Sequence, residues 1–189
     1  MDPGPIIERL TPSHAADYRS LMLTAYGDEP LAFTATVAER EPLPLEWWEA
    51  RVQPDPGAEQ MVMGAFVDRQ LVGVAGLRLR RRPRTRHKAI LYGMFVLPEF
   101  RNKGIGRRLV ASVLEHARAT ADIRLVQLRV AESNLPGIHL YRSCGFTTFG
   151  TEPYANKTED GFVSVIHMWR FVDAHRNEPK STQTSDQED

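Results

Sequence analysis

Short apolar runs separated by polar stretches divide this chain into strands and amphipathic helices. The predicted strands span residues 6–10, 61–67, 71–80, 90–97, 125–130, 146–150 and 162–169. Asp68-Arg69-Gln70 predicts the turn of a hairpin between the second and third strands, and a long polar connection is expected between the last two. The run at 125–130 is mainly apolar, interrupted by Gln127 and Arg129, and we interpret it as a buried strand.

Helices are predicted between these strands. The clearest spans residues 104–121, where apolar residues recur on one stripe: Ile105, Leu109, Val110, Val113, Leu114 and Ala117. A helix is expected over residues 13–26, and one short helix, starting near Pro44, within the proline-rich connection 28–60. Another begins at Ser133 or Asn134 and ends at Gly145. The element order, β-α-α-β-β-β-α-β-α-β-β, predicts an α/β or α+β fold with a mixed sheet covered by helices.

Composition narrows the class of protein. The 189 residues suffice for one domain, and 24 Lys and Arg balance 24 Asp and Glu, so no overall charge favours nucleic acid or a membrane surface. No stretch approaches the ~20 apolar residues of a membrane span. The amino terminus lacks a secretory signal's apolar core and Cys144 is the single cysteine, so we expect a cytoplasmic protein. The domain is expected at 1–172, followed by a disordered polar tail at 173–189.

A basic, glycine-containing loop connects the strand at 90–97 to the helix at 104–121. Helix N-termini carry unpaired N–H groups and the positive end of the macrodipole, and they therefore attract phosphate oxygens. Gly104 and Gly106 allow the backbone to approach such a ligand closely, while Arg101, Lys103 and Arg107 add positive charge. The loop therefore predicts a pyrophosphate site.

The spacing of this loop excludes two common phosphate-binding motifs. A P-loop requires Gly-Lys-Ser/Thr, but here Lys103 precedes the glycine. The dinucleotide motif requires a third glycine where this chain has Leu109. A tight strand-to-helix turn with solvated basic residues remains the alternative interpretation of the loop.

Two motifs together resemble a known family. Arg101-Asn102-Lys103-Gly104-Ile105-Gly106 resembles the coenzyme A motif Arg/Gln-x-x-Gly-x-Gly/Ala of the GNAT superfamily of N-acyltransferases. Downstream, Asn134 precedes Tyr141 by seven residues, and Gly145-Phe146 follow, as in the helix after the fifth strand of GNAT enzymes. The predicted element order also matches, so the resemblance covers roughly residues 5–171.

The resemblance implies a fold and a reaction. The expected fold is a mixed, mostly antiparallel sheet of about seven strands, flanked by helices and splayed between strands four and five. The expected reaction transfers an acetyl group from acetyl-CoA, the cosubstrate, to a primary amine of a small molecule or peptide. The amine attacks directly in a ternary complex, so no acyl-enzyme forms, and Cys144 is interpreted as a small packed side chain.

The resemblance also implies site residues. Tyr141 is expected to be the general acid that protonates the departing thiolate, because a phenol and a thiol have pKa values within ~2 units of each other. Backbone N–H groups of the fourth strand are expected to stabilise the oxyanion, and Gly93 can permit the bulge that opens this strand. The implied cofactor-binding residues are Met94, Phe95, Val96, Arg101, Asn102, Lys103, Gly104, Ile105, Gly106, Arg107 and Asn134.

The chain departs from the family pattern at the general base. Many family members carry a Glu on strand four or five, whereas residues 89–97 contain no carboxylate and the fifth-strand position is Arg129. We considered Glu132, Tyr92 and Glu29 for the general base and assign this role to none of them. Solvent can take the proton instead, or an acceptor amine with a low pKa needs no base. A non-catalytic acyl-CoA sensor on the same fold is therefore the alternative function.

The sequence favours neither a nucleic acid nor a metal ion as a partner. Seven basic residues crowd the hairpin at 78–88, and we interpret them as a solvated loop rather than a nucleic-acid surface, because aromatic residues are not interleaved with them. The histidines lack metal-ligand spacing, so no metal is assigned. The resemblance allows a homodimer, and it names neither the amine acceptor nor the length of the acyl group.

Overall fold

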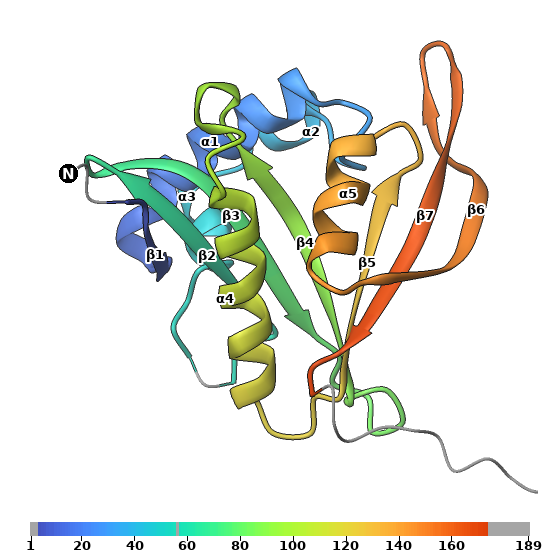
Figure 1. The fold of residues 1–189 in the computed structure, drawn as a ribbon. Coiled ribbons are helices and arrows are strands. Elements are labelled where there is room, and N and C mark those ends of the chain that lie inside the picture. The colour runs from blue at the N-terminus through green and yellow to red at the C-terminus, as the bar shows by residue number, and fades with distance from the viewer. Residues whose placement is uncertain (1–3, 56, 174–189) are drawn as a thin grey trace, which may run out of the picture.

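The computed structural model describes residues 4–55 and 57–173 and shows one seven-stranded sheet (Figure 1). The strands are β1 (Ile6–Arg9), β2 (Gln60–Val67), β3 (Gln70–Leu79), β4 (Lys88–Val96), β5 (Leu125–Ala131), β6 (Thr147–Thr158) and β7 (Gly161–Phe171). Their spatial order is β1-β2-β3-β4-β5-β7-β6, and every neighbouring pair is antiparallel except β4 and β5. The expected mixed, mostly antiparallel sheet is confirmed. The polar-tail prediction falls almost wholly on residues 174–189, outside the described part.

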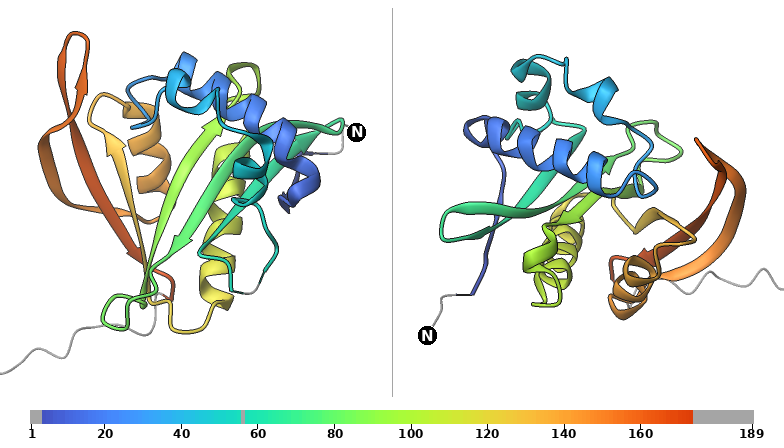
Figure 2. Two further views of the ribbon diagram at one scale, coloured as in Figure 1. Left: turned by 180° about the vertical axis from the view of Figure 1, so that it is seen from behind. Right: turned by 90° about the horizontal axis from the view of Figure 1, so that it is seen from above.

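Helices cover the two faces of the sheet unequally (Figures 1 and 2). The helices are α1 (Ala15–Asp28), α2 (Val37–Arg40), α3 (Leu45–Glu49), α4 (Ile105–Ala119) and α5 (Leu135–Ser143), with short 3₁₀ turns at Pro12–His14 and Pro98–Phe100. The first three lie on one face of the amino-terminal half, whereas α4 and α5 lie on the opposite face. Among the described residues, no helix is long and apolar enough to cross a membrane.

Two apolar layers hold these helices against the sheet. The stripe predicted for α4 is buried at every position and packs on β2, β3 and β4. On the other face, α1 and α3 pack on β3 and β4 through a second cluster that includes Leu21, Met22 and Trp48. Trp48 is fully buried, with the Tyr18 ring edge-on at 5.6 Å. Trp48 of the proline-rich connection therefore belongs to the core, and the partly buried Trp47 packs against it.

Two elements differ from the sequence prediction. The long polar connection predicted between the last strands was wrong, because β6 continues to Thr158 and only two residues separate it from β7. β6 is an edge strand with most side chains exposed, so main-chain pairing sustains it without apolar alternation; Pro153 sits at a break in its register. The proline-rich connection also holds two short helices rather than one. α2 forms on a capping box in which Thr36 and Glu39 bond each other's backbone N–H groups.

The sheet opens between β4 and β5. Those strands pair only at their first three positions, from Lys88 opposite Leu125 to Ile90 opposite Gln127. Immediately beyond, two residues of β4, Gly93 and Met94, oppose the single Ala75 of β3, which is a β-bulge. Gly93 has a φ of +61°, a conformation that glycine adopts without the steric penalty of a Cβ. The bulge expected at Gly93 and the splay of the sheet are therefore confirmed, and Figure 1 shows the two strands diverging.

Replacing Gly93 with alanine is expected to lower the free energy of unfolding by about 1–2 kcal/mol, because the left-handed backbone forces a Cβ against the carbonyl. Gly150 provides a matched control: a Cβ meets nothing within 4 Å at either position, but the backbone of Gly150 is not left-handed. Gly150→Ala should change stability by less than about 0.5 kcal/mol. Urea denaturation of both variants measures the difference, and equal effects would contradict a strained bulge.

Candidate active site

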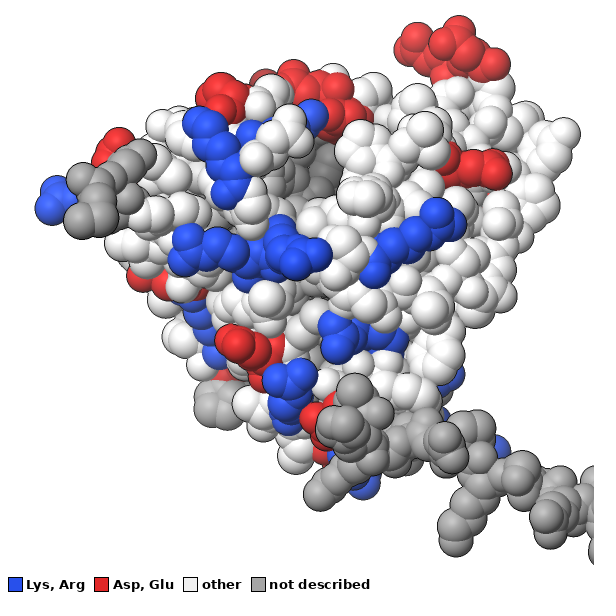
Figure 3. Space-filling model, in the orientation of Figure 1, with Lys and Arg blue, Asp and Glu red and all other residues white. Residues whose placement is uncertain are grey.

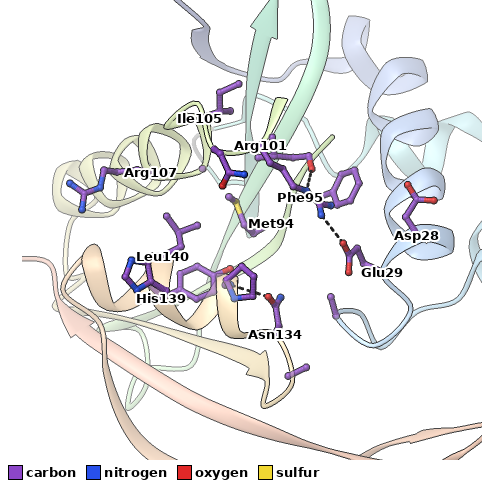
Figure 4. A pocket seen from close by; sticks show the side chains of 18 of the residues that line it. Asp28, Glu29, Met94, Phe95, Arg101, Ile105, Arg107, Asn134, His139 and Leu140 are labelled. Atoms are coloured by element: carbon purple, nitrogen blue, oxygen red, sulfur yellow. Dashed lines mark hydrogen bonds and ion pairs between the residues drawn. The ribbon is translucent and has the colours of Figure 1, made fainter. Parts of the chain in front are cut away.

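A cavity of about 1010 Å³ occupies the opening between β4 and β5 (Figure 4). Four segments line it: residues 28–33 at the end of α1 and beyond it, the end of β4, residues 100–107 around the start of α4, and residues 131–143 around α5. Eleven of the twelve residues singled out from the sequence line this one cavity: Met94, Phe95, Val96, Arg101, Asn102, Gly104, Ile105, Gly106, Arg107, Asn134 and Tyr141. The exception is Lys103, whose ammonium lies over the Phe100 ring at 5.2 Å.

The β4 wall offers backbone donors to the cavity. Leu97 donates its N–H to the Val72 carbonyl on β3 at 2.9 Å, so the N–H of Val96, one residue earlier, points the opposite way. By the same alternation the N–H of Met94 also faces away from β3, and among the described residues β5 no longer pairs with β4 here. These two groups can donate to a carbonyl oxygen that enters the opening.

The loop before α4 forms the end of the cavity suited to an anion. Gly104 caps α4 with a φ of +78°, and the first N–H groups of the helix have no partner within it. A Cβ on Gly106 would approach Met94 Cε at 3.0 Å and Leu140 Cδ2 at 3.1 Å, so a side chain there would crowd the cavity between β4 and α5. Arg107 donates to the Ser143 carbonyl at 3.2 Å and thereby ties α4 to α5. This end fits a pyrophosphate.

Charge is distributed unevenly over this face of the molecule. Figure 3 shows Lys and Arg side chains gathered over α4 and the loop before it, and acidic side chains above them near the α1–α2 segment. Asp28 and Glu29, at the end of α1, line the cavity on the acidic side. The cavity therefore runs from a basic end to an acidic end.

Arg101 extends toward the acidic end. Its Nε donates to the Val96 carbonyl at 2.9 Å, and its Nη1 lies 2.9 Å from Oε1 of Glu29 (Figure 4). The guanidinium also lies 5.5 Å from the centroid of the Phe95 ring. The sequence motif suggested that this side chain contacts the cofactor, but the structure joins it to β4 and to the residue after α1.

On the opposite wall, α5 places Asn134 and Tyr141. Asn134 caps α5 by accepting the Gly137 N–H on its Oδ1 at 2.9 Å, which leaves its amide NH₂ available. Tyr141 lies two turns later on the same helix, buried, with the Phe146 ring edge-on at 6.0 Å. Burial raises the pKa of Tyr141 well above the usual phenol value, and the Cys144 thiol adds to that rise. The raised pKa makes this phenol a weaker proton donor than the unperturbed value used in the sequence-based expectation.

Of the residues considered as a general base, only Glu29 lines the cavity in the described part of the chain. The Tyr92 hydroxyl donates to Oε1 of Gln60 at 3.0 Å outside the cavity lining, and burial raises the pKa of Tyr92 to about 12. Arg129 pairs with Glu152, which also bonds His167 at 2.8 Å, on an exposed part of β5–β7. Of the carboxylates weighed from the sequence, Glu29 lines the cavity and Glu132 does not.

The Arg-rich hairpin joins β3 to β4 at the start of β4, whereas the cavity lies at the end of that strand. Two of its arginines form exposed ion pairs, Arg81 with Glu59 at 3.1 Å and Arg86 with Asp122 at 3.4 Å. The hairpin is therefore separate from the candidate active site.

Comparisons with known proteins show which family the chain belongs to. The sequence model of the Acetyltransferase (GNAT) family matches residues 19–146. Over 124 residues the chain is 29% identical to the L-amino acid N-acetyltransferase AaaT of Escherichia coli, covering 65% of this chain and 74% of that protein. Over 89 residues it is 38% identical to the N-alpha-acetyltransferase RimI of Mycobacterium tuberculosis, covering 47% of this chain and 52% of that protein.

A solved structure shows the same fold. The structure of yncA, a putative acetyltransferase from Salmonella typhimurium with its cofactor acetyl-CoA, superposes with a TM-score of 0.74. The superposition covers 94% of this chain and 99% of the other, at 19% sequence identity.

Cys144 is expected to react slowly. Burial raises the pKa of its thiol, so the reactive thiolate is scarcer near neutral pH than in an unfolded chain. At pH 7.5, iodoacetamide should therefore alkylate the native protein more slowly than the urea-unfolded protein, and the native rate should keep rising with pH above 9. A native rate at or above the unfolded rate would contradict this environment and make Cys144 a candidate nucleophile.

Proposed function

Because the chain belongs to the Acetyltransferase (GNAT) family, we propose that it is an acetyl-CoA-dependent N-acetyltransferase acting on a primary amine of a small molecule or peptide. The observation that carries this proposal is the pair of outward-facing N–H groups on β4, which open into a cavity that also contains the phosphate-type loop. The relatives named for L-amino acid and N-alpha acetylation support an α-amino group as the acceptor.

The donor occupies the basic end in this proposal. The pyrophosphate of acetyl-CoA binds the N–H groups at the start of α4, where Gly104 and Gly106 leave room for it. The pantetheine arm then follows the open edge of β4, with the Asn134 amide on the facing helix. The acetyl-CoA bound in the Salmonella relative supports the use of this cosubstrate by the fold.

The β4 donors promote the chemical step. As the amine nitrogen attacks the thioester carbonyl, negative charge grows on the carbonyl oxygen, and the N–H groups of Met94 and Val96 stabilise it. The C–S bond then breaks as the carbonyl re-forms. An acceptor that binds as an ammonium releases one proton before it attacks and a second as the amide forms. The leaving sulfur takes up one proton and solvent takes the other, so protons balance without a covalent acyl-enzyme.

Tyr141 acts on the leaving sulfur. Its raised pKa keeps the hydroxyl protonated across the physiological range, and it makes complete proton transfer to a thiolate unfavourable. Tyr141 therefore stabilises the departing sulfur chiefly as a hydrogen-bond donor. The amine's proton leaves by solvent at the open acidic end, since β4 carries no carboxylate.

The central experiment follows coenzyme A release from acetyl-CoA in the presence of amines with a thiol reagent. The wild-type protein should release thiol faster when an α-amine is added. Tyr141→Phe should lower kcat at least tenfold because the hydrogen bond to sulfur is lost, while the Kd of acetyl-CoA changes less than about threefold. Since its pKa is raised, Tyr141 should cause no fall in kcat between pH 8 and 10. Acetyl-CoA binding without amine-dependent release would instead favour the acyl-CoA sensor.

Asn134 has a structural role that can be separated from cofactor binding. Asn134→Ala removes the cap and should cost about 1 kcal/mol, whereas Asn134→Ser keeps an oxygen acceptor for Gly137 and should cost less than about 0.5 kcal/mol. Both variants lose the amide NH₂, so both should weaken acetyl-CoA binding, by up to about tenfold. Denaturation and calorimetric titration measure the two effects, and wild-type affinity in Asn134→Ser would contradict an amide contact.

A further inference from the structure

The ion pair between Glu29 and Arg101 lines the cavity beside the end of β4. We propose that this pair is the binding site for a zwitterionic acceptor, a free α-amino acid, with its carboxylate on Arg101 and its ammonium on Glu29. The inference rests on the proposed function and selects between its two acceptor classes.

Arg101 holds its guanidinium beside the reacting centre. The bond from Nε to the Val96 carbonyl fixes the side chain against the residue whose N–H faces the cavity. A ligand carboxylate on the guanidinium would therefore lie next to the oxyanion donors. The guanidinium bonds the Val96 carbonyl and Glu29, neither of which belongs to the loop before α4.

Each partner keeps one polar atom available to a ligand. Nη1 of Arg101 and Oε1 of Glu29 bond each other, but within residues 4–55 and 57–173 no interaction engages Nη2 of Arg101 or Oε2 of Glu29. The side chains are 39% and 42% exposed, and both line the cavity. The pair thus presents a donor and a negatively charged acceptor side by side.

An α-amino acid carries the complementary groups on one carbon atom. A guanidinium binds a carboxylate through a planar fork of N–H donors, and Oε2 of Glu29 can accept from an ammonium. Asp28 also lines this end and adds a second carboxylate for the cation. A half-exposed ion pair contributes only about 0–1 kcal/mol to stability, so rearranging it around a ligand costs little.

An internal peptide bond replaces the carboxylate in a peptide or protein acceptor. Arg101 would then face a neutral amide instead of an anion, and the charge-assisted interaction would be lost. The geometry therefore favours the free amino acid over a polypeptide amino terminus.

The test compares an L-amino acid with its primary amide as acceptor in the thiol-release assay. Arg101→Gln should lower kcat/KM for the amino acid by about tenfold to a hundredfold, but for the amide by less than about threefold. Because the same two substrates are compared in both proteins, their different amine pKa values cancel in the ratio. Glu29→Gln should lower kcat/KM for both substrates, since both carry the ammonium. The Kd of acetyl-CoA should stay within about twofold throughout.

Matched controls separate a binding role from a structural one. Arg108→Gln and Glu46→Gln remove the same charges at exposed positions outside the cavity and should change neither substrate. Arg101→Lys keeps the charge but not the fork, so it should restore part of the preference. Thermal unfolding shows whether Arg101→Gln destabilises the loop before α4. If it does, the selectivity of Arg101→Lys is compared with that of the wild-type protein instead.

Three results would overturn the inference. Equal losses of kcat/KM for both substrates in Arg101→Gln would indicate a structural role for Arg101. A weakened affinity for acetyl-CoA with unchanged selectivity would indicate that Arg101 binds the cosubstrate instead. Either result leaves the proposed acetyltransferase standing. Acetyl-CoA binding with no amine-dependent thiol release would overturn the proposed function and this inference together.

Discussion

The separation of β4 from β5 is the constraint on which the candidate site depends. A sheet normally satisfies each strand's N–H and C=O groups on both sides, but β4 leaves its β5 neighbour after three paired positions. The bulge at Gly93 marks where this happens and turns the end of β4 so that its outward N–H groups face a cavity. Unpaired donors at that edge are costly for a fold and useful to a carbonyl ligand.

The rest of the molecule keeps the opening in place. The buried stripe of α4 fixes the phosphate-type loop against the end of β4. The helix α5, which follows β5, lines the facing wall with its cap Asn134 and the buried Tyr141. On the far face, α1 and α3 pack through Trp48 and hold Asp28 and Glu29 at the acidic end. The two apolar layers therefore hold the loop before α4, the helix α5 and the end of α1 around one cavity.

The sequence was most informative where local chemistry decides structure. The α4 stripe from Ile105 to Ala117 and the glycines of the loop act within a few residues and appear as expected. Of the two caps that the sequence allowed for α5, Ser133 and Asn134, the structure uses Asn134. The extension of β6 was missed because pairing with β7 sustains that edge strand, a contact that its own polar residues do not reveal. The Glu29–Arg101 pair joins positions 72 residues apart, and the raised pKa of Tyr141 comes from burial, so neither can be deduced from spacing.

Amide hydrogen exchange of β4 tests the central claim most directly. In the free protein, Met94 and Val96 should exchange quickly, while Phe95 and Leu97, which face β3, should be protected. Saturation with acetyl-CoA should slow exchange at Met94 and Val96 by about tenfold or more and leave their neighbours little changed. Protection of Met94 and Val96 before acetyl-CoA is added, or no slowing after it, would contradict an open strand edge that receives the thioester.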